Sequence, residues 1–290
     1  MRVRFRFTKL GKIRFTSQRD VARMWERALR RAAMPLAYTE GFSPRPQLSF
    51  GLALPTSCES LAEYLDVVLD DDRPETADII VSALPARFTD LLPPGIEVEE
   101  AALVERRGGS LQQQVTSCSW TMQFSGVTPE ELEQQVASLL AAPSVPIVRE
   151  RKGRQELDDL RPSVLALSVT GSAEPVGGGP RTVGLVAELA TQPRGVRPVE
   201  LVRGLIAASG PSREPSSGSS SAPSSGAIAV GGGGATGAAT GGGTVGIPVL
   251  DRACRTQQWI ERDGERLEPL GRTEGTSGAG RATHALERAS

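Results

Sequence analysis

The chain of 290 residues is long enough for two modest domains, and its formal net charge of −1 excludes none of the common kinds of partner. No run of the sequence approaches the roughly 18 apolar residues of a membrane span, so we expect no membrane partner. Residues 1–50 hold twelve Lys and Arg against three Asp and Glu, whereas the rest of the chain holds 21 against 31, which favours one basic surface for an anionic partner.

The first residues alternate between apolar and basic side chains, which is typical of a half-buried strand. Val3, Phe5 and Phe7 are expected to face the core. A Gly-containing turn at 9–12 and renewed alternation at 13–15 predict a hairpin over 2–16. Its solvent face would be basic and would carry Arg2, Arg4, Arg6, Lys12 and Arg14.

A helix is expected after this hairpin, because Ser17 and Asp20 fit a capping box and Pro35 ends the helical pattern. Its apolar stripe has helical spacing and contains Val21, Trp25, Ala28, Leu29 and Ala32. The opposite face carries five arginines, Arg19, Arg23, Arg27, Arg30 and Arg31. We treat these five as candidate nucleic-acid-binding residues, although an arginine stripe is also common on a solvated helix face.

The remaining elements of the first half are expected as short strands at 36–41 and 46–51, a strand at 61–70, a helix at 75–88 and a strand at 95–104. Asp66 would be the exposed position of its strand. A similar set follows, with strands at 113–124, 164–171, 182–190 and 250–261, helices at 129–142 and 197–208, and a hairpin at 146–160 that turns near Gly153.

These elements predict an α+β fold of two ferredoxin-like domains, at 1–105 and 110–262, each with an antiparallel sheet and helices on one face. Residues 210–246 are rich in Gly, Ser, Ala and Pro and are expected to form a flexible linker inserted in the second domain. Residues 271–290 are expected to be a disordered tail.

The segment TEGFSPRPQL at 39–48 predicts a stiff loop, because Ser43 and Arg45 each precede a proline, Pro44 and Pro46. One hypothesis is that the loop fixes Arg45 to contact a phosphate or a partner carboxylate. The alternative is that Arg45 pairs within the chain, with Glu40 or Glu59. Phe42, after Gly41, is either a base-stacking residue or an anchor of the loop.

Several segments resemble the DUF2344 family of radical SAM-linked proteins in its stand-alone form. They are RFRFTKLGKIRFTSQRD at 4–20, GFSPRP followed by LSF at 41–50, EYLDVVL at 63–69, and RKGR and DDLRP downstream. The resemblance covers roughly 2–205 and the strand near 252–260. The resemblance implies a separate radical SAM protein as a partner. Genes for stand-alone members of the family are often found beside genes for a ribonuclease E/G-type enzyme and ribosomal proteins, which favours a role that involves RNA. Relatives commonly have His where this chain has Gln18.

Catalytic motifs are sparse in the sequence. The three cysteines, Cys58, Cys118 and Cys254, have no metal or iron–sulfur spacing and are typical of reduced thiols in a cytoplasmic protein, so no cofactor is expected. His284 is the one histidine and lies in the predicted tail. The glycine runs at 231–234 and 241–244 lack the lysine of a phosphate-binding loop. An enzyme that uses carboxylates such as Glu40 and Asp20 is the least favoured interpretation.

The sequence therefore favours a non-catalytic accessory protein that binds RNA through basic side chains of its N-terminal domain, in RNA maturation or a ribosome-related process. The alternative function is a protein-interaction module whose basic face docks on an acidic surface of a separate radical SAM enzyme. A steep fall of affinity with salt across many RNA sequences would distinguish the first from the second.

Overall fold

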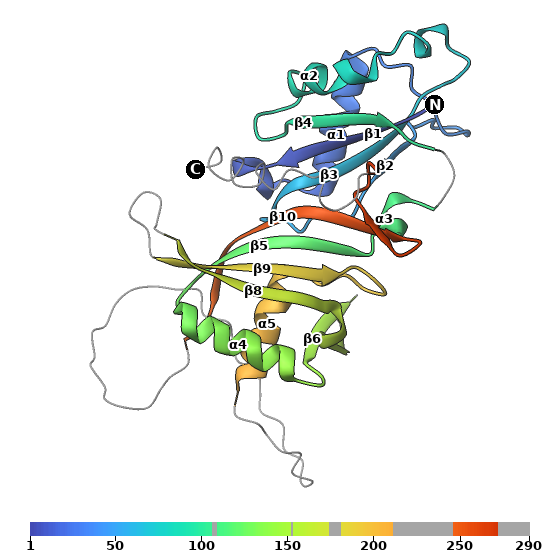
Figure 1. The fold of residues 1–290 in the computed structure, drawn as a ribbon. Coiled ribbons are helices and arrows are strands. Elements are labelled where there is room, and N and C mark those ends of the chain that lie inside the picture. Colours follow the sequence, from blue (N-terminus) through green and yellow to red (C-terminus); the bar gives the residue numbers. More distant parts are fainter. Residues whose placement is uncertain (106–108, 152, 174–180, 211–245, 272–290) are drawn as a thin grey trace.

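The computed structural model describes residues 1–105, 109–151, 153–173, 181–210 and 246–271 (Figure 1). The segments expected to be a linker (210–246) and a tail (271–290) lie almost entirely outside the described residues. Among the residues that are described, no helix has the length and apolar character needed to cross a membrane.

The N-terminal half contains one small sheet covered by helices. Its elements in chain order are β1 (Arg2–Lys9), the 3₁₀ helix η1 (Gly11–Phe15), α1 (Gln18–Arg31), β2 (Leu48–Phe50), β3 (Glu59–Val68), the 3₁₀ turns η2 (Pro74–Thr76) and η3 (Val81–Ala83), α2 (Leu84–Thr89) and β4 (Val98–Leu103). The strands lie in the order β4-β1-β3, and β2 pairs with part of the other edge of β3.

The C-terminal half repeats this arrangement. Its elements are α3 (Leu111–Gln114), β5 (Ser117–Ser125), α4 (Pro129–Ala141), β6 (Pro146–Arg151), β7 (Arg154–Asp159), η4 (Arg161–Ser163), β8 (Val164–Ala173), β9 (Thr182–Ala190), α5 (Pro198–Ser209), β10 (Val249–Arg262) and β11 (Glu265–Leu267). The strands lie in the order β10-β5-β9-β8, whereas β6 and β7 form a hairpin of their own.

Strand β10 joins the two halves into one nine-stranded sheet. It pairs with β5 on one side and, in parallel, with β3 on the other, where Cys254 lies opposite Glu59 and Arg255 opposite Ser60. Every other strand pair of the described sheet is antiparallel. The predicted mixture of helices with mostly antiparallel strands is confirmed, but a single sheet runs through both halves (Figure 1).

The predicted apolar stripe of α1 is confirmed, and it forms the centre of the N-terminal core. Trp25 is fully buried and lies against Phe5 and Phe7 of β1 and Phe88 of α2, with ring centroids 5.1 to 5.6 Å apart. Because one face of β1 contacts both helices, α1 and α2 cover the same face of the sheet. In the other half, Leu132 of α4 and Leu201 of α5 share one core.

Three local predictions need correction. Residues 13–15 belong to η1 and are no strand, because β3 and β4 already occupy the two edges of β1. Residues 36–41 form only isolated bridges, Leu36 to Leu69 and Tyr38 to Pro46, and Pro46 has no backbone N–H with which to extend a ladder. The helix predicted at 75–88 is reduced to two 3₁₀ turns and α2, with Pro85 in the first turn of α2.

Replacing Trp25 by Ala should lower the free energy of unfolding by about 3–5 kcal/mol, because it empties a fully buried site between three aromatic rings. Chemical denaturation of the full chain measures this change. Arg27→Ala on the exposed face of the same helix is the matched control and should change stability by less than about 0.5 kcal/mol. Equal losses in the two variants would contradict this account of the core.

Candidate nucleic-acid interface

Helix α1 presents the five predicted arginines on its exposed side. Its N-cap is Ser17, whose hydroxyl oxygen accepts from the Asp20 backbone N–H at 3.2 Å. The Ser17 hydroxyl also donates to the Asp20 carboxylate at 2.7 Å, and this hydrogen bond lowers the pKa of Asp20. With the apolar stripe fixed in the core, the other side of the helix must face solvent, and we call its side chains the α1 arginine face: Arg19, Arg23, Arg27, Arg30 and Arg31.

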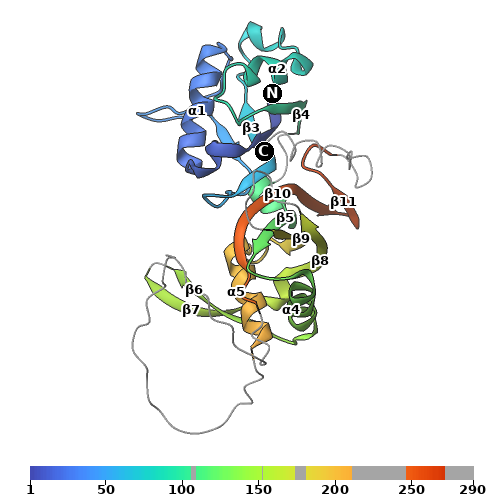
Figure 2. The same ribbon diagram turned by 90° about the vertical axis from the view of Figure 1, so that its left-hand side faces the viewer.

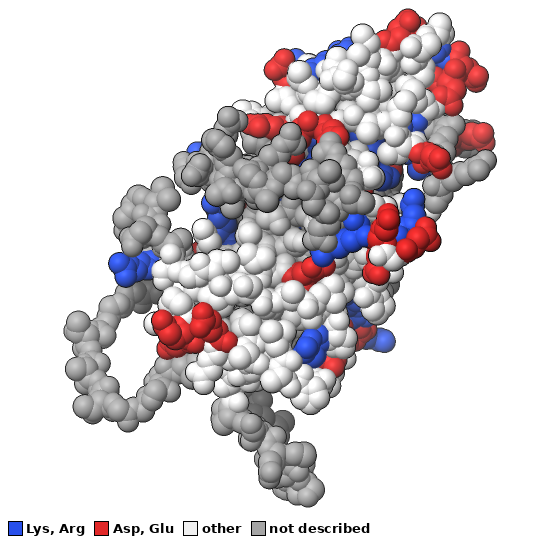
Figure 3. Space-filling model, viewed as in Figure 1, with Lys and Arg blue, Asp and Glu red and all other residues white. Residues whose placement is uncertain are grey.

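These arginines are largely free of internal ion pairs. Within the described residues, Arg23 pairs with Asp20 at 3.4 Å, and both side chains are about half exposed, so the pair contributes little. The other four arginines of this face make no ion pair within the described part of the chain. The face therefore keeps its charge available. On the side of the molecule seen in Figure 3, acidic and basic side chains are instead interspersed over the N-terminal half.

The loop predicted at 39–48, which we call the Pro-Arg-Pro loop, is closed at its base by two hydrogen bonds between Thr39 and Arg45. The Thr39 N–H donates to the Arg45 carbonyl at 2.9 Å, and the Arg45 N–H donates to the Thr39 hydroxyl at 3.1 Å. Gly41 has φ of +119°, a conformation that other residues rarely adopt. Phe42 is fully exposed at the tip, so it does not anchor the loop. Figure 2 shows the loop projecting on the side of the sheet that α1 covers.

Arg45 is exposed, and no ion pair of the described residues includes it. Of the two internal partners considered, Glu40 is exposed on the same loop, whereas Glu59 is fully buried elsewhere. The Glu59 carboxylate contacts Arg14 at 3.3 Å and also Arg252. The described structure thus leaves the Arg45 side chain free for a partner.

The strand arginines of β1 do not form a basic solvent face, and this prediction was wrong. Arg4 is buried and makes two hydrogen bonds to Asp66, at 2.6 and 2.8 Å. Arg6 is at the limit of burial and pairs with Glu99 at 3.1 Å and Glu268 at 3.3 Å. Asp66, expected to be exposed, is therefore also buried.

The reason is a segment from the other end of the described chain. Residues 265–271 fold over this face of β1, and the Pro269 carbonyl accepts from Arg4 at 2.6 Å. Gln257 donates to Glu268 at 2.6 Å and accepts from the Tyr64 hydroxyl at 3.1 Å. Burial raises the pKa of Tyr64. We call this network the polar seam, and its members are Arg4, Arg6, Tyr64, Asp66, Gln257 and Glu268.

On the other side of the sheet, Arg255 fastens the two halves together. It is 2 % exposed, donates to Glu63 of β3 at 2.6 Å and to the Leu52 carbonyl at 2.8 Å, and its guanidinium lies 5.8 Å from the Trp120 ring. A buried arginine of this kind needs its carboxylate, because an unpaired charge in the interior is costly.

Replacing Arg255 by Met should lower the free energy of unfolding by about 3–5 kcal/mol, because the Glu63 carboxylate is left buried without its partner. Chemical denaturation measures the loss. In the double variant Arg255→Met/Glu63→Leu the unpaired charge is removed as well, so the loss should be smaller than in the single variant. A double variant less stable than the single one would contradict this role.

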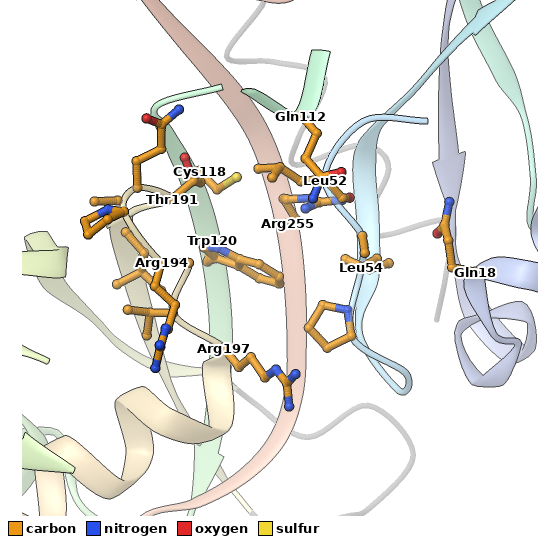
Figure 4. A pocket seen from close by; sticks show the side chains of 18 of the residues that line it. Gln18, Leu52, Leu54, Gln112, Cys118, Trp120, Thr191, Arg194, Arg197 and Arg255 are labelled. Carbon is orange, nitrogen blue, oxygen red and sulfur yellow. The ribbon is translucent and has the colours of Figure 1, made fainter. Parts of the chain in front are cut away.

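A groove of about 1370 Å³ lies between the two halves. It is lined by residues from separate parts of the chain, namely Gln18, residues 52–56, Ser110, residues 112–113, Cys118, Trp120, residues 189–197, Val199 and Arg255. In Figure 4, Gln18 lies across the groove from Thr191 and Arg194, with Trp120 and Arg255 between them. The sequence analysis missed this groove, because its residues follow no motif.

The three cysteines are free and buried, and none is set up as a nucleophile. Burial raises the pKa of Cys58 and Cys118 to about 11 and that of Cys254 to about 12. No group of three or more His, Cys, Asp or Glu residues in the described ranges is placed to hold a metal ion. His284 and the glycine runs at 231–234 and 241–244 lie outside those ranges.

The native chain should therefore react slowly with a thiol reagent such as 5,5′-dithiobis(2-nitrobenzoate). With a pKa near 11, about one thiol in a thousand is ionised at pH 8, and burial limits access further. Raising the pH from 7 to 9 should leave the native rate low, whereas all three thiols should react in guanidinium chloride. Fast reaction of one native thiol at pH 7 would contradict this description.

A family model described as "Uncharacterized protein conserved in bacteria (DUF2344)" matches residues 2–198. The chain belongs to the DUF2344 family. The match includes the α1 arginine face, the Pro-Arg-Pro loop and most of the groove, whereas the strand near 252–260, also expected to resemble this family, lies outside it. No curated protein matches this DUF2344 member.

Proposed function

We propose that the protein is a non-catalytic accessory protein that binds RNA, in RNA maturation or a ribosome-related process. The observation that carries the proposal is the α1 arginine face, where four of five exposed arginines have no ion pair within the described chain. Arginines of this kind neutralise phosphates and release condensed counterions, which supplies most of the sequence-independent affinity for nucleic acid.

The Pro-Arg-Pro loop supports the same proposal. It adds Arg45, which is exposed and unpaired within the described residues, and Phe42, a fully exposed ring on a loop closed by backbone hydrogen bonds. An exposed aromatic ring beside cations suits an unpaired base, which stacks on it while the cations contact phosphates. The buried arginines of β1 take no part, so the interface consists of α1 and this loop.

A protein partner with an acidic surface, such as a separate radical SAM enzyme, is the alternative occupant of the same face. The α1 arginine face would meet carboxylates as readily as phosphates, whereas a solvent-exposed Phe42 favours a partner with flat, stackable bases. We therefore prefer RNA and treat the protein partner as an outcome of the test below.

We further propose that each half is a ferredoxin-like unit. The N-terminal half has the chain order β1-α1-β2-β3-α2-β4 and the strand order β4-β1-β3, with β2 on the edge of β3 that faces away from β1. If the hairpin β6–β7 is set aside, the C-terminal half has the chain order β5-α4-β8-β9-α5-β10 and the strand order β10-β5-β9-β8. The two orders correspond strand for strand, which supports the proposal.

Neutralising two arginines of α1 should weaken RNA binding. In the variant Arg23→Gln/Arg27→Gln the fold should be kept, because both side chains are exposed, and each lost phosphate contact should lower the salt slope of the association constant by about one. Titration of labelled bulk transfer and ribosomal RNA at several salt concentrations measures both the affinity and the slope. Arg45→Gln should act in the same direction.

The matched control is Arg154→Gln/Arg262→Gln, which removes two exposed arginines, on β7 and at the end of β10, that lie on neither α1 nor the loop. It should bind RNA within about twofold of the unchanged chain. Absence of binding at low salt would overturn the RNA proposal. Co-purification with an iron–sulfur protein, lost in the double variant but kept in the control, would then favour the protein partner.

A further inference from the structure

The groove between the halves has a one-sided charge. Among the described residues that line it there are three arginines, Arg194, Arg197 and Arg255, and no Asp or Glu. Two of the three arginines form ion pairs with carboxylates that do not line the groove. Arg255 pairs with Glu63, and Arg194 lies 3.3 Å from Glu156. The third arginine, Arg197, makes no ion pair within the described residues.

Arg197 is therefore the free cation of the groove, and it lies where the groove continues into a second one. The second groove, of about 1090 Å³, runs between β6 and α5 and shares Pro193, Arg194, Gly195, Arg197 and Val199 with the first. It adds Arg203, which is exposed and makes no ion pair within the described residues, together with Arg149, Glu200 and the exposed Glu150; Arg149 pairs with Glu200 at 3.4 Å. We call the two grooves together the trough.

The size of the trough favours a polymer over a small molecule. Each groove alone exceeds the upper limit of ordinary small-ligand pockets, and both are partly open to solvent. An extended chain fits such a shape. The free cations Arg197, the N-cap of α5, and Arg203 are six residues apart, or roughly 9 Å along the helix axis, so they can contact successive charges along that chain.

The walls carry the groups that contact bases. Gln18 and Gln112 make no side-chain hydrogen bond within the described residues, so their amides are free to donate to and accept from base edges. Leu52, Pro55 and Val199 add apolar surface against which flat rings can pack. Trp120 contributes little stacking surface, because it is 3 % exposed and lies beneath Arg255.

We propose that the trough binds a single-stranded segment of RNA, with phosphates at Arg197 and Arg203 and bases against the apolar and amide side chains. The inference rests on the proposed function. Gln18 is the first residue of α1 and also lines the first groove, so the trough opens at the end of the α1 arginine face. A duplex would lie on α1, and its single-stranded extension would enter the trough.

An acidic peptide is the competing occupant. It would satisfy Arg197 and Arg203, and its backbone N–H and C=O groups would pair with Gln18 and Gln112, but it would leave the apolar wall without flat rings to pack against. The lining therefore favours nucleotides, in which one repeating unit carries both the charge and the ring.

The test is fluorescence-anisotropy titration of the full chain with three labelled probes: a 12-nucleotide oligouridylate, a blunt RNA duplex, and a polyglutamate peptide of equal charge. The trough variant is Arg197→Gln/Arg203→Gln, and the control is Arg154→Gln/Arg262→Gln, two exposed arginines that line neither groove. The trough variant should lower the salt slope for oligouridylate by about 1.4 and leave duplex binding within about twofold.

The outcomes separate this inference from the proposed function. If the trough variant binds oligouridylate as the control does while Arg23→Gln/Arg27→Gln loses RNA, the trough inference is overturned and the function remains. If the trough variant alone loses oligouridylate, the trough stands and the α1 assignment falls. Polyglutamate bound as tightly as oligouridylate would overturn the trough as an RNA site.

Discussion

The parallel pairing of β10 with β3 is the contact on which the rest of the molecule depends. Only two residue pairs, Cys254 with Glu59 and Arg255 with Ser60, make up this parallel ladder, yet it converts two small sheets into one. Because so short a ladder is weak alone, side-chain contacts between the two strands reinforce it: Arg255 pairs with Glu63, Arg252 pairs with Glu59, and Tyr64 donates to Gln257 in the polar seam.

The same contact shapes one of the two candidate binding surfaces. The trough has walls from both halves, so its shape depends on the angle at which β10 fixes them. The α1 arginine face is fixed instead by the N-terminal core, whereas Arg4 and Arg6 on the other face of the sheet are paired with Asp66, Glu99 and Glu268. The excess of positive charge in the first 50 residues thus divides in two. One part stabilises the interior, and the other remains on α1 and the loop for a partner.

Local pattern predicted most of the helices and strands and one of the two candidate surfaces, the α1 arginine face with its loop. Alternation in β1 gave Val3, Phe5 and Phe7 as core, and helical spacing gave Trp25 and the arginines opposite it, because neighbours in sequence decide these contacts. The burial of Arg4 could not be predicted in this way, since its partners Asp66 and Pro269 are 62 and 265 residues away in the sequence. The trough was missed for the same reason. The one local signal was TQPRGVRP at 191–198, a loop rich in proline and arginine that leads into α5.

The late position of β10 in the chain also has a consequence for synthesis. A ribosome makes the chain from the N-terminus, so β1 to β4 and then β5 to β9 emerge while the edge of β3 that β10 will cover is still open, along with Glu59 and Glu63. Each half has most of its own core by then. The nascent protein therefore presents the α1 arginine face early, and it acquires a trough with two fixed walls only when one of its last strands has been translated.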